Sequence, residues 1–74
     1  MERNIRLNWT AIVEEAIRRR KELKLSQRHL AAIANVSQPT VSRFEQCKAD
    51  IQLSSVFAIL EVLGMLETGL NLIG

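Results

Sequence analysis

The sequence predicts a small all-α domain of four to five helices, and three observations support this fold class. The chain has 74 residues, a length typical of one domain, so we treat 1–74 as a single unit. Apolar residues make up 47% of the chain and recur mainly at helical spacing. Three glycines and one proline are too few for a turn-rich β fold.

The first helix is predicted over residues 9–24. Apolar residues recur from Trp9 to Ile17 at three- and four-residue intervals, and Leu23 is expected to rejoin the core side. Asn8 stands at the position of an N-cap. Acidic residues come early in this segment and basic residues come late, an order that suits the helix dipole.

A second helix is predicted over residues 27–34, with Ser26 as its N-cap. Its inner face consists of Leu30, Ala31 and Ala34. Asn35 follows the last of these alanines. Asparagine tolerates the left-handed conformation that closes many helices, so we expect the second helix to end at this residue.

The proline of the sequence, Pro39, is predicted to start a third helix over residues 38–46. With Ser37 as N-cap, Pro39 lies in the first turn, where backbone N–H groups have no helical partner to lose. Its fixed φ angle favours the start of a helix. Val41 and Phe44 then face the core.

A fourth, strongly apolar helix is predicted from Leu53 to Leu63, and Gly64 is expected to end it. The segment between the third and fourth helices, residues 48–53, is expected to be a connector. The fourth helix is apolar on nearly every side, so part of its surface is expected to contact another chain.

The two ends of the chain show a short period-two pattern. Residues 1–8 are interpreted as an arm or short strand, and residues 66–74 as a tail or dimerisation strand. The segments NIRLN and LNLI could pair as β-strands, within one chain or between two. Two alternatives stay open: frayed ends, or an N-terminal arm whose Arg3 and Arg6 enter the minor groove of DNA.

Charge is distributed unevenly along the sequence. Residues 1–48 carry all ten Lys and Arg and five acids, a net charge of +5. Residues 49–74 carry three acids and no base, a net charge of −3. A basic half beside an acidic half favours one surface that binds a polyanion.

A single cysteine, Cys47, excludes an internal disulfide and a cysteine-based zinc site. One unpaired thiol suits a reducing cytoplasm, where we expect the protein to act. No run of 18 apolar residues occurs, and the charged start lacks the apolar segment of a signal peptide, so we expect no membrane segment and no signal peptide. We expect no metal and no cofactor.

Two short helices joined by a three-residue turn, after a longer helix, form a helix-turn-helix arrangement. Ala31 is small where the two helices would cross closely, and Val36 and Val41 would fill the angle between them. The segment LSQRHLAAIANVSQPTVSRFEQ, residues 25–46, resembles the DNA-binding domains of Cro-like phage repressors and Xre-type bacterial regulators. The resemblance extends over about residues 12–65 and implies a lambda-repressor-like fold. The chain departs from the family pattern at Asn35 and Cys47, where many members have glycine.

The resemblance implies that the third helix enters the major groove of DNA and reads base edges. Glutamine can bond adenine and arginine can bond guanine, each in a bidentate manner. The residues expected to read bases are Gln38, Pro39, Thr40 and Arg43. The residues expected to contact phosphates are Gln27, Arg28, Ser37, Ser42, Gln46 and Lys48. The resemblance also implies a structural ion pair between Arg20 and Glu45.

The function expected from these features is sequence-specific binding of double-stranded DNA by a dimeric transcriptional regulator that represses by occlusion. The homodimer is expected to form through apolar side chains of the fourth helix and the tail, namely Phe57, Leu60, Met65, Leu66, Leu70 and Leu72. The alternative is an antitoxin-like interaction module that binds and neutralises a toxin or other partner protein. We expect no enzymatic activity, because the sequence offers no catalytic constellation.

Overall fold

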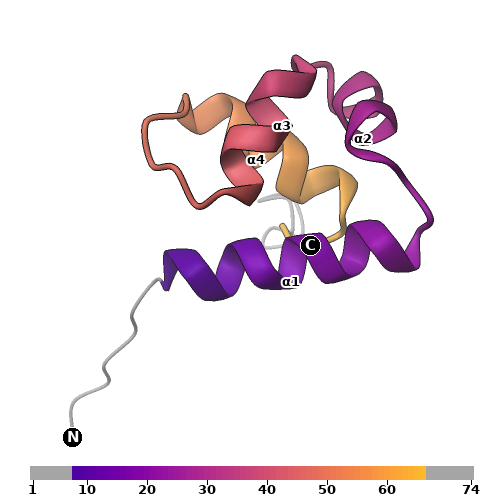
Figure 1. Cartoon of the computed structure of the whole chain (residues 1–74), viewed down its shortest axis with the longest axis horizontal. Helices are drawn as coiled ribbons and strands as arrows, with labels where there is room; N and C mark the ends of the chain where they lie inside the picture. The colour runs from indigo at the N-terminus through magenta and orange to yellow at the C-terminus, as the bar shows by residue number, and fades with distance from the viewer. Residues whose placement is uncertain (1–7, 67–74) are drawn as a thin grey trace, which may run out of the picture.

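The computed structural model describes residues 8–66, which form four helices. They are α1 (Trp9–Glu22), α2 (Gln27–Ala34), α3 (Gln38–Glu45) and α4 (Leu53–Val62). Helix α1 lies along one side of the domain, and the three shorter helices form a compact group beside it (Figure 1). Within residues 8–66 no strand occurs, so the predicted all-α class is confirmed. The two segments considered as strands lie outside the described residues.

The first three helices begin where the sequence predicts. The side-chain oxygens of Asn8, Ser26 and Ser37 each accept a hydrogen bond from the backbone N–H three residues further on, at 3.0 to 3.2 Å. Each such cap stabilises its helix by about 1 kcal/mol. Pro39 lies in the first turn of α3, as expected. Helix α3 therefore starts at a fixed residue.

All four helices end in the same geometry. Each is followed by a residue in the left-handed region: Lys24, Asn35, Cys47 and Gly64 have φ angles of 59°, 61°, 64° and 73°. In every case the next residue donates its backbone N–H to the carbonyl five positions earlier, at 2.9 to 3.1 Å. These bonds satisfy carbonyls that a helix end leaves without a partner and reverse the chain within a few residues.

The core lies where the four helices meet, and Phe44 of α3 is at its centre. The Trp9 indole packs against the Phe44 ring edge-to-face, with centroids 5.6 Å apart and an interplanar angle of 85°. The buried residues are Val13, Ala16, Leu30, Ala31, Ala34, Val41, Phe44, Val56, Ile59, Leu60 and Leu63. This set includes the inner faces that the sequence predicts for α2 and α3.

Leu23 corrects one expectation about the core. It was predicted to rejoin the core side, but it is 54% exposed. The reason is that α1 ends at Glu22 rather than at Lys24, so Leu23 stands in the turn that reverses the chain at Lys24 and not on the apolar face of the helix.

We predict that Asn35→Ala will lower the free energy of unfolding by about 1 kcal/mol, because alanine is strained in the left-handed conformation that Asn35 adopts. Asn35→Gly, the matched control, should stay within about 0.5 kcal/mol of the parent. Urea unfolding followed by far-UV circular dichroism measures both. Equal stability of the two variants would show that the left-handed turn does not constrain this position.

Candidate nucleic-acid interface

The outward surface of α3 carries the residues predicted to read bases. Gln38 and Pro39 are exposed in its first turn, and Arg43 is exposed one turn later. On the opposite side of the same helix, Val41 and Phe44 are completely buried. The buried pair fixes the rotation of α3, so the polar residues face solvent as a consequence of how the core packs.

Thr40 differs from the other three predicted base-reading residues because it is half-buried. Its hydroxyl lies 2.7 Å from the hydroxyl of Ser37, whose oxygen also caps α3. These two residues therefore hold the start of α3 together. Sequence patterns predicted the cap but not the contact between the two hydroxyls.

Glu45, at the end of α3, joins three helices through its carboxylate. Arg20 of α1 donates from Nε to Glu45 Oε2 at 2.6 Å and from Nη2 to Oε1 at 3.1 Å. Gln27 of α2 donates from Nε2 to Glu45 Oε1 at 2.8 Å. Arg20 Nη1 also donates to the Leu25 carbonyl at 2.8 Å. The structure thus contains the ion pair between Arg20 and Glu45 and adds Gln27 to it.

The side chains of Arg20 and Glu45 are only 13% and 9% exposed. A charge pair at this depth is not an exposed surface bridge, and loss of one partner leaves the other poorly hydrated. A displacement of α3 from α1 that breaks the pair would therefore leave two poorly hydrated charges.

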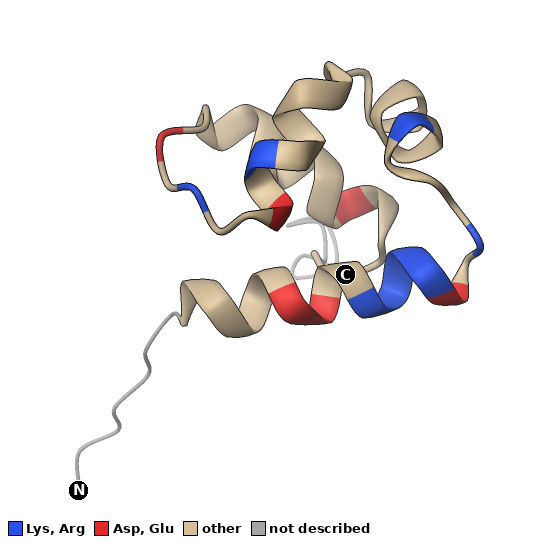
Figure 2. Cartoon of the chain, viewed as in Figure 1, with Lys and Arg blue, Asp and Glu red and all other residues tan. Residues whose placement is uncertain are grey.

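The remaining residues predicted to contact phosphates flank α3. Arg28 on α2 is exposed, as are Gln46 and Lys48 beyond the end of α3. Ser42 is half-buried, and its hydroxyl accepts a hydrogen bond from Gln46 Nε2 at 3.1 Å. Figure 2 shows the basic segments of α2, α3 and the loop after α3 separated from the basic end of α1. Gln27 is turned toward Glu45, so its side chain has a structural contact that the sequence did not predict.

The basic run at the end of α1 is bound largely within the domain. Arg18 contacts both Glu15 and Glu22 at 2.6 Å, and Arg19 Nε contacts Glu15 at 2.7 Å. Arg19 Nη1 also donates to the carbonyls of Leu63 and Gly64 at the end of α4, at 3.1 and 2.8 Å. Hydrogen bonds from Arg18 and then Arg19 lower the pKa of Glu15 to about 2. Much of the positive charge in this run is therefore balanced by acids on the same helix.

Asp50 is a member of the site that sequence reasoning missed. It lies in the loop between α3 and α4, and its Oδ2 accepts a hydrogen bond from Arg43 Nη2. The Arg43 guanidinium lowers the pKa of the Asp50 carboxyl, chiefly through this hydrogen bond. The seven-residue spacing of Arg43 and Asp50 equals two helical turns, but α3 ends between them and the chain reverses at Cys47, so helical periodicity does not explain their contact. The pair borders a hollow of about 220 Å³ that is also lined by Thr40, Ile51, Gln52 and Ser55.

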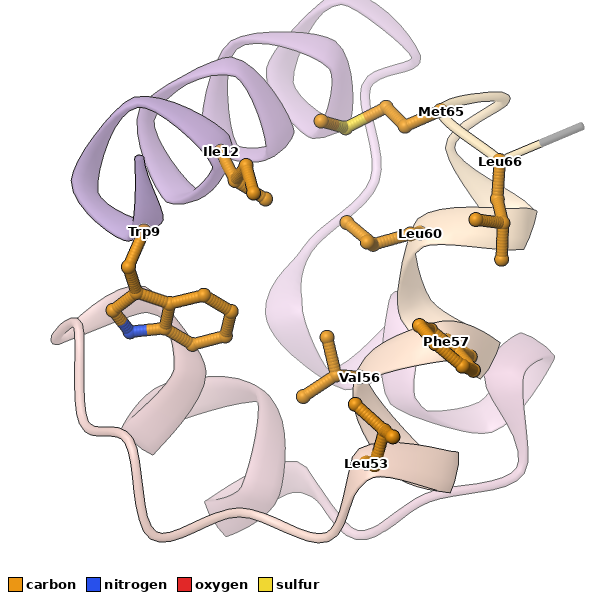
Figure 3. A pocket seen from close by; sticks show the side chains of 8 residues that line it. All are labelled: Trp9, Ile12, Leu53, Val56, Phe57, Leu60, Met65 and Leu66. Carbon is orange, nitrogen blue, oxygen red and sulfur yellow. The ribbon is translucent and has the colours of Figure 1, made fainter. Parts of the chain in front are cut away.

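An apolar groove lies on the side of the domain formed by α1 and α4. It has a volume of about 320 Å³, and its walls come from α1, α4 and the residues after α4 (Figure 3). Phe57 on its rim is 46% exposed, whereas Leu60 lies at its buried base. The lining residues are Trp9, Ile12, Leu53, Val56, Phe57, Leu60, Met65 and Leu66. Four residues predicted for dimerisation thus line one groove, and Leu70 and Leu72 lie outside the described residues.

The part of the chain that the structure describes, residues 8–66, has neither a cluster of metal ligands nor a membrane-spanning helix. No group of three or more His, Cys, Asp or Glu side chains there is arranged to hold a metal ion. No helix there combines the length and apolar character needed to cross a membrane.

Comparison with known families agrees with this geometry. A family model described as helix-turn-helix matches residues 17–70, well over half of the chain. The chain belongs to the helix-turn-helix family. The membership inferred from residues 25–46 is confirmed, and α2, the turn at Asn35 and α3 form the motif of this helix-turn-helix domain.

One curated relative is similar over most of this domain. It is an uncharacterized HTH-type transcriptional regulator of Haemophilus influenzae, and the two sequences are 33% identical over 63 residues. The match covers 85% of this chain and 61% of the relative. The chain therefore spans about three fifths of the length of the curated relative that it matches.

We predict that Glu45→Gln will lower the free energy of unfolding by about 3 kcal/mol, because Arg20 would keep its charge in a poorly hydrated position without a carboxylate. Glu14→Gln on the exposed side of α1 makes the same charge change and should cost less than about 0.5 kcal/mol. Chemical unfolding monitored by tryptophan fluorescence compares them. Similar values for the two variants would mean that the buried pair does not hold the helices together.

Proposed function

We propose that this chain is the DNA-binding part of a cytoplasmic, non-enzymatic transcriptional regulator and that it binds double-stranded DNA at specific sequences. The observation that carries the proposal is the polar, outward face of α3 on a helix whose opposite face is completely buried. Helix α3 has eight residues, and the diameter of an α-helix with its side chains, about 10–12 Å, matches the width of the major groove, about 12 Å. Family membership supports the same placement.

The chemistry of the exposed residues suits base recognition. Arg43 presents a guanidinium that can bond O6 and N7 of guanine, and Gln38 presents an amide that can bond N6 and N7 of adenine. Pro39 offers an apolar ring to a thymine methyl. Arg28 of α2 and Lys48 of the loop after α3, both exposed, would contact phosphates and set the register of the helix in the groove.

Repression by occlusion is the regulatory action that we propose. A domain bound across an operator prevents polymerase from occupying the same DNA. The relative from Haemophilus influenzae carries the name of a transcriptional regulator, which supports a role in transcription.

We propose further that the protein acts as a homodimer and that a second copy covers the apolar groove. A single recognition helix of eight residues makes a small interface, and paired half-sites about 34 Å apart increase both affinity and specificity. The groove supports this choice because Leu53 and Phe57 expose large apolar surfaces on its rim. The described chain also ends on the groove at Leu66, and the next eight residues include Leu70 and Leu72.

The same groove favours one second candidate function. An antitoxin-like module would use the exposed apolar side chains of Leu53 and Phe57 to bind a partner protein, and DNA binding would be secondary. The two functions differ in what they predict for the purified chain. A dimer covers its own groove, whereas a module that awaits a partner stays monomeric.

We predict that selection from random duplexes will recover a preferred sequence and that Arg43→Ala will relax the preference at one base position by about 10- to 100-fold. Lys48→Ala should weaken binding to all sequences alike and reduce the slope of log K against log salt by about 1. Fluorescence anisotropy over a range of salt concentrations measures both effects. Affinity that does not change with salt, or an Arg43→Ala variant with unaltered preference, would contradict the proposed mode of binding.

We predict that Phe57→Glu will convert the dimer to a monomer, because it places a charge on the rim of the apolar groove. Leu23→Glu introduces the same charge at an equally exposed apolar residue outside the groove and should leave the dimer intact. Sedimentation velocity distinguishes the two states, and circular dichroism checks that both variants fold. A monomeric parent protein would instead favour the interaction module.

A further inference from the structure

The contact between Arg43 and Asp50 places a carboxylate on the surface that is proposed to bind DNA. Asp50 is 69% exposed at the side chain, and its carboxylate lies beside the guanidinium proposed to read a base. A negative charge at this place repels phosphates and opposes binding to every duplex. Within the described residues, Glu15 and Glu22 of α1 and Glu45 at the end of α3 contact basic residues away from this face.

We propose that Asp50 is a positioning residue that determines specificity by holding the Arg43 guanidinium in a fixed orientation for base recognition. This inference rests on the proposed function, because it assigns a role within the same DNA-binding surface. Asp50 itself need not touch a base.

The first argument concerns the donors of Arg43. A guanidinium carries five N–H groups in one plane, and Asp50 accepts from Nη2. The other N–H groups of the guanidinium remain available to bond a base. The Asp50 carboxylate restricts the orientation of the guanidinium plane in which they lie. A free arginine side chain samples many rotamers and loses that freedom on binding, so a pre-oriented one binds its base with a smaller entropic cost.

The second argument concerns the loop that carries Asp50. The backbone N–H of Lys48 bonds the Arg43 carbonyl at 3.1 Å, and Ile51 packs against the core. The carbonyl of Gln52 accepts the first backbone hydrogen bonds of α4. Asp50 thus stands between anchored residues on both sides, so the backbone position from which its carboxylate reaches Arg43 is constrained.

The third argument concerns the balance of charge in a complex. At neutral pH Asp50 is ionised, as an unperturbed aspartate is, and the hydrogen bond from Arg43 lowers the pKa of its carboxyl further. When Arg43 bonds a guanine it can still neutralise Asp50, so the carboxylate is compensated. When the facing base offers no acceptor and Arg43 turns toward a phosphate instead, Asp50 loses its partner and stays close to the DNA. Compensation of Asp50 at the correct base and its loss of a partner at a wrong base both raise the ratio of specific to non-specific affinity.

A double-mutant cycle tests this role with the full chain. The operator recovered by selection, and the same operator changed at the base that Arg43→Ala affects, serve as the two probes. Asp50→Asn is expected to reduce the discrimination between them by about fivefold or more, in keeping with coupling energies between contacting residues. In the Arg43→Ala background the same change should leave discrimination unaltered, because nothing remains to be oriented.

Glu61→Gln is the matched control, since it removes one negative charge from an exposed residue of α4 and should leave discrimination as in the parent. A change in stability alone would not alter the preference for one base, so the readout separates positioning from a structural role. If Asp50→Asn raises affinity for both probes equally and keeps the discrimination, Asp50 only repels DNA and the inference is overturned. If the parent protein binds no duplex at all, the proposed function itself fails.

Discussion

The carboxylate of Glu45 is the constraint on which the arrangement of the helices depends. It receives hydrogen bonds from Arg20 of α1 and Gln27 of α2 while belonging to α3, so one group at the end of α3 holds the two neighbouring helices. Apolar packing of Val41 and Phe44 fixes which face of α3 is buried. The ion pair then fixes where the helix lies. Together they determine which side chains can reach a partner outside the domain.

Local features of this fold could be predicted from the sequence because each depends on a few consecutive residues. Ser26 and Ser37 mark helix starts, Asn35 marks a left-handed turn, and Pro39 marks a first turn, since the backbone chemistry of these residue types permits few alternatives. The residues at which helices end were harder to predict from the sequence. The left-handed turn after α1 is formed by Lys24, a residue type that does not indicate such a turn as glycine does, so the exposure of Leu23 was not predicted.

The contacts between distant side chains could be predicted only in part. The pair between Arg20 and Glu45 followed from the resemblance, but the participation of Gln27 in that pair depends on the angle between two helices, which the sequence does not display. Asp50 was missed for a similar reason: a loop brings it back to Arg43, and spacing along the chain gives no sign of that return. The net charge of residues 1–48 likewise did not show that Arg18 and Arg19 pair with Glu15 and Glu22 on the same helix.

The division of α3 into a buried face and an outward face has an evolutionary consequence. The residues that hold the helix in place, such as Phe44 and Glu45, are different from the residues that point outward, such as Gln38 and Arg43. Exchange of the outward set therefore leaves the scaffold intact. Gene duplication followed by a few substitutions on that face is thus a short route to a paralogue with a different target.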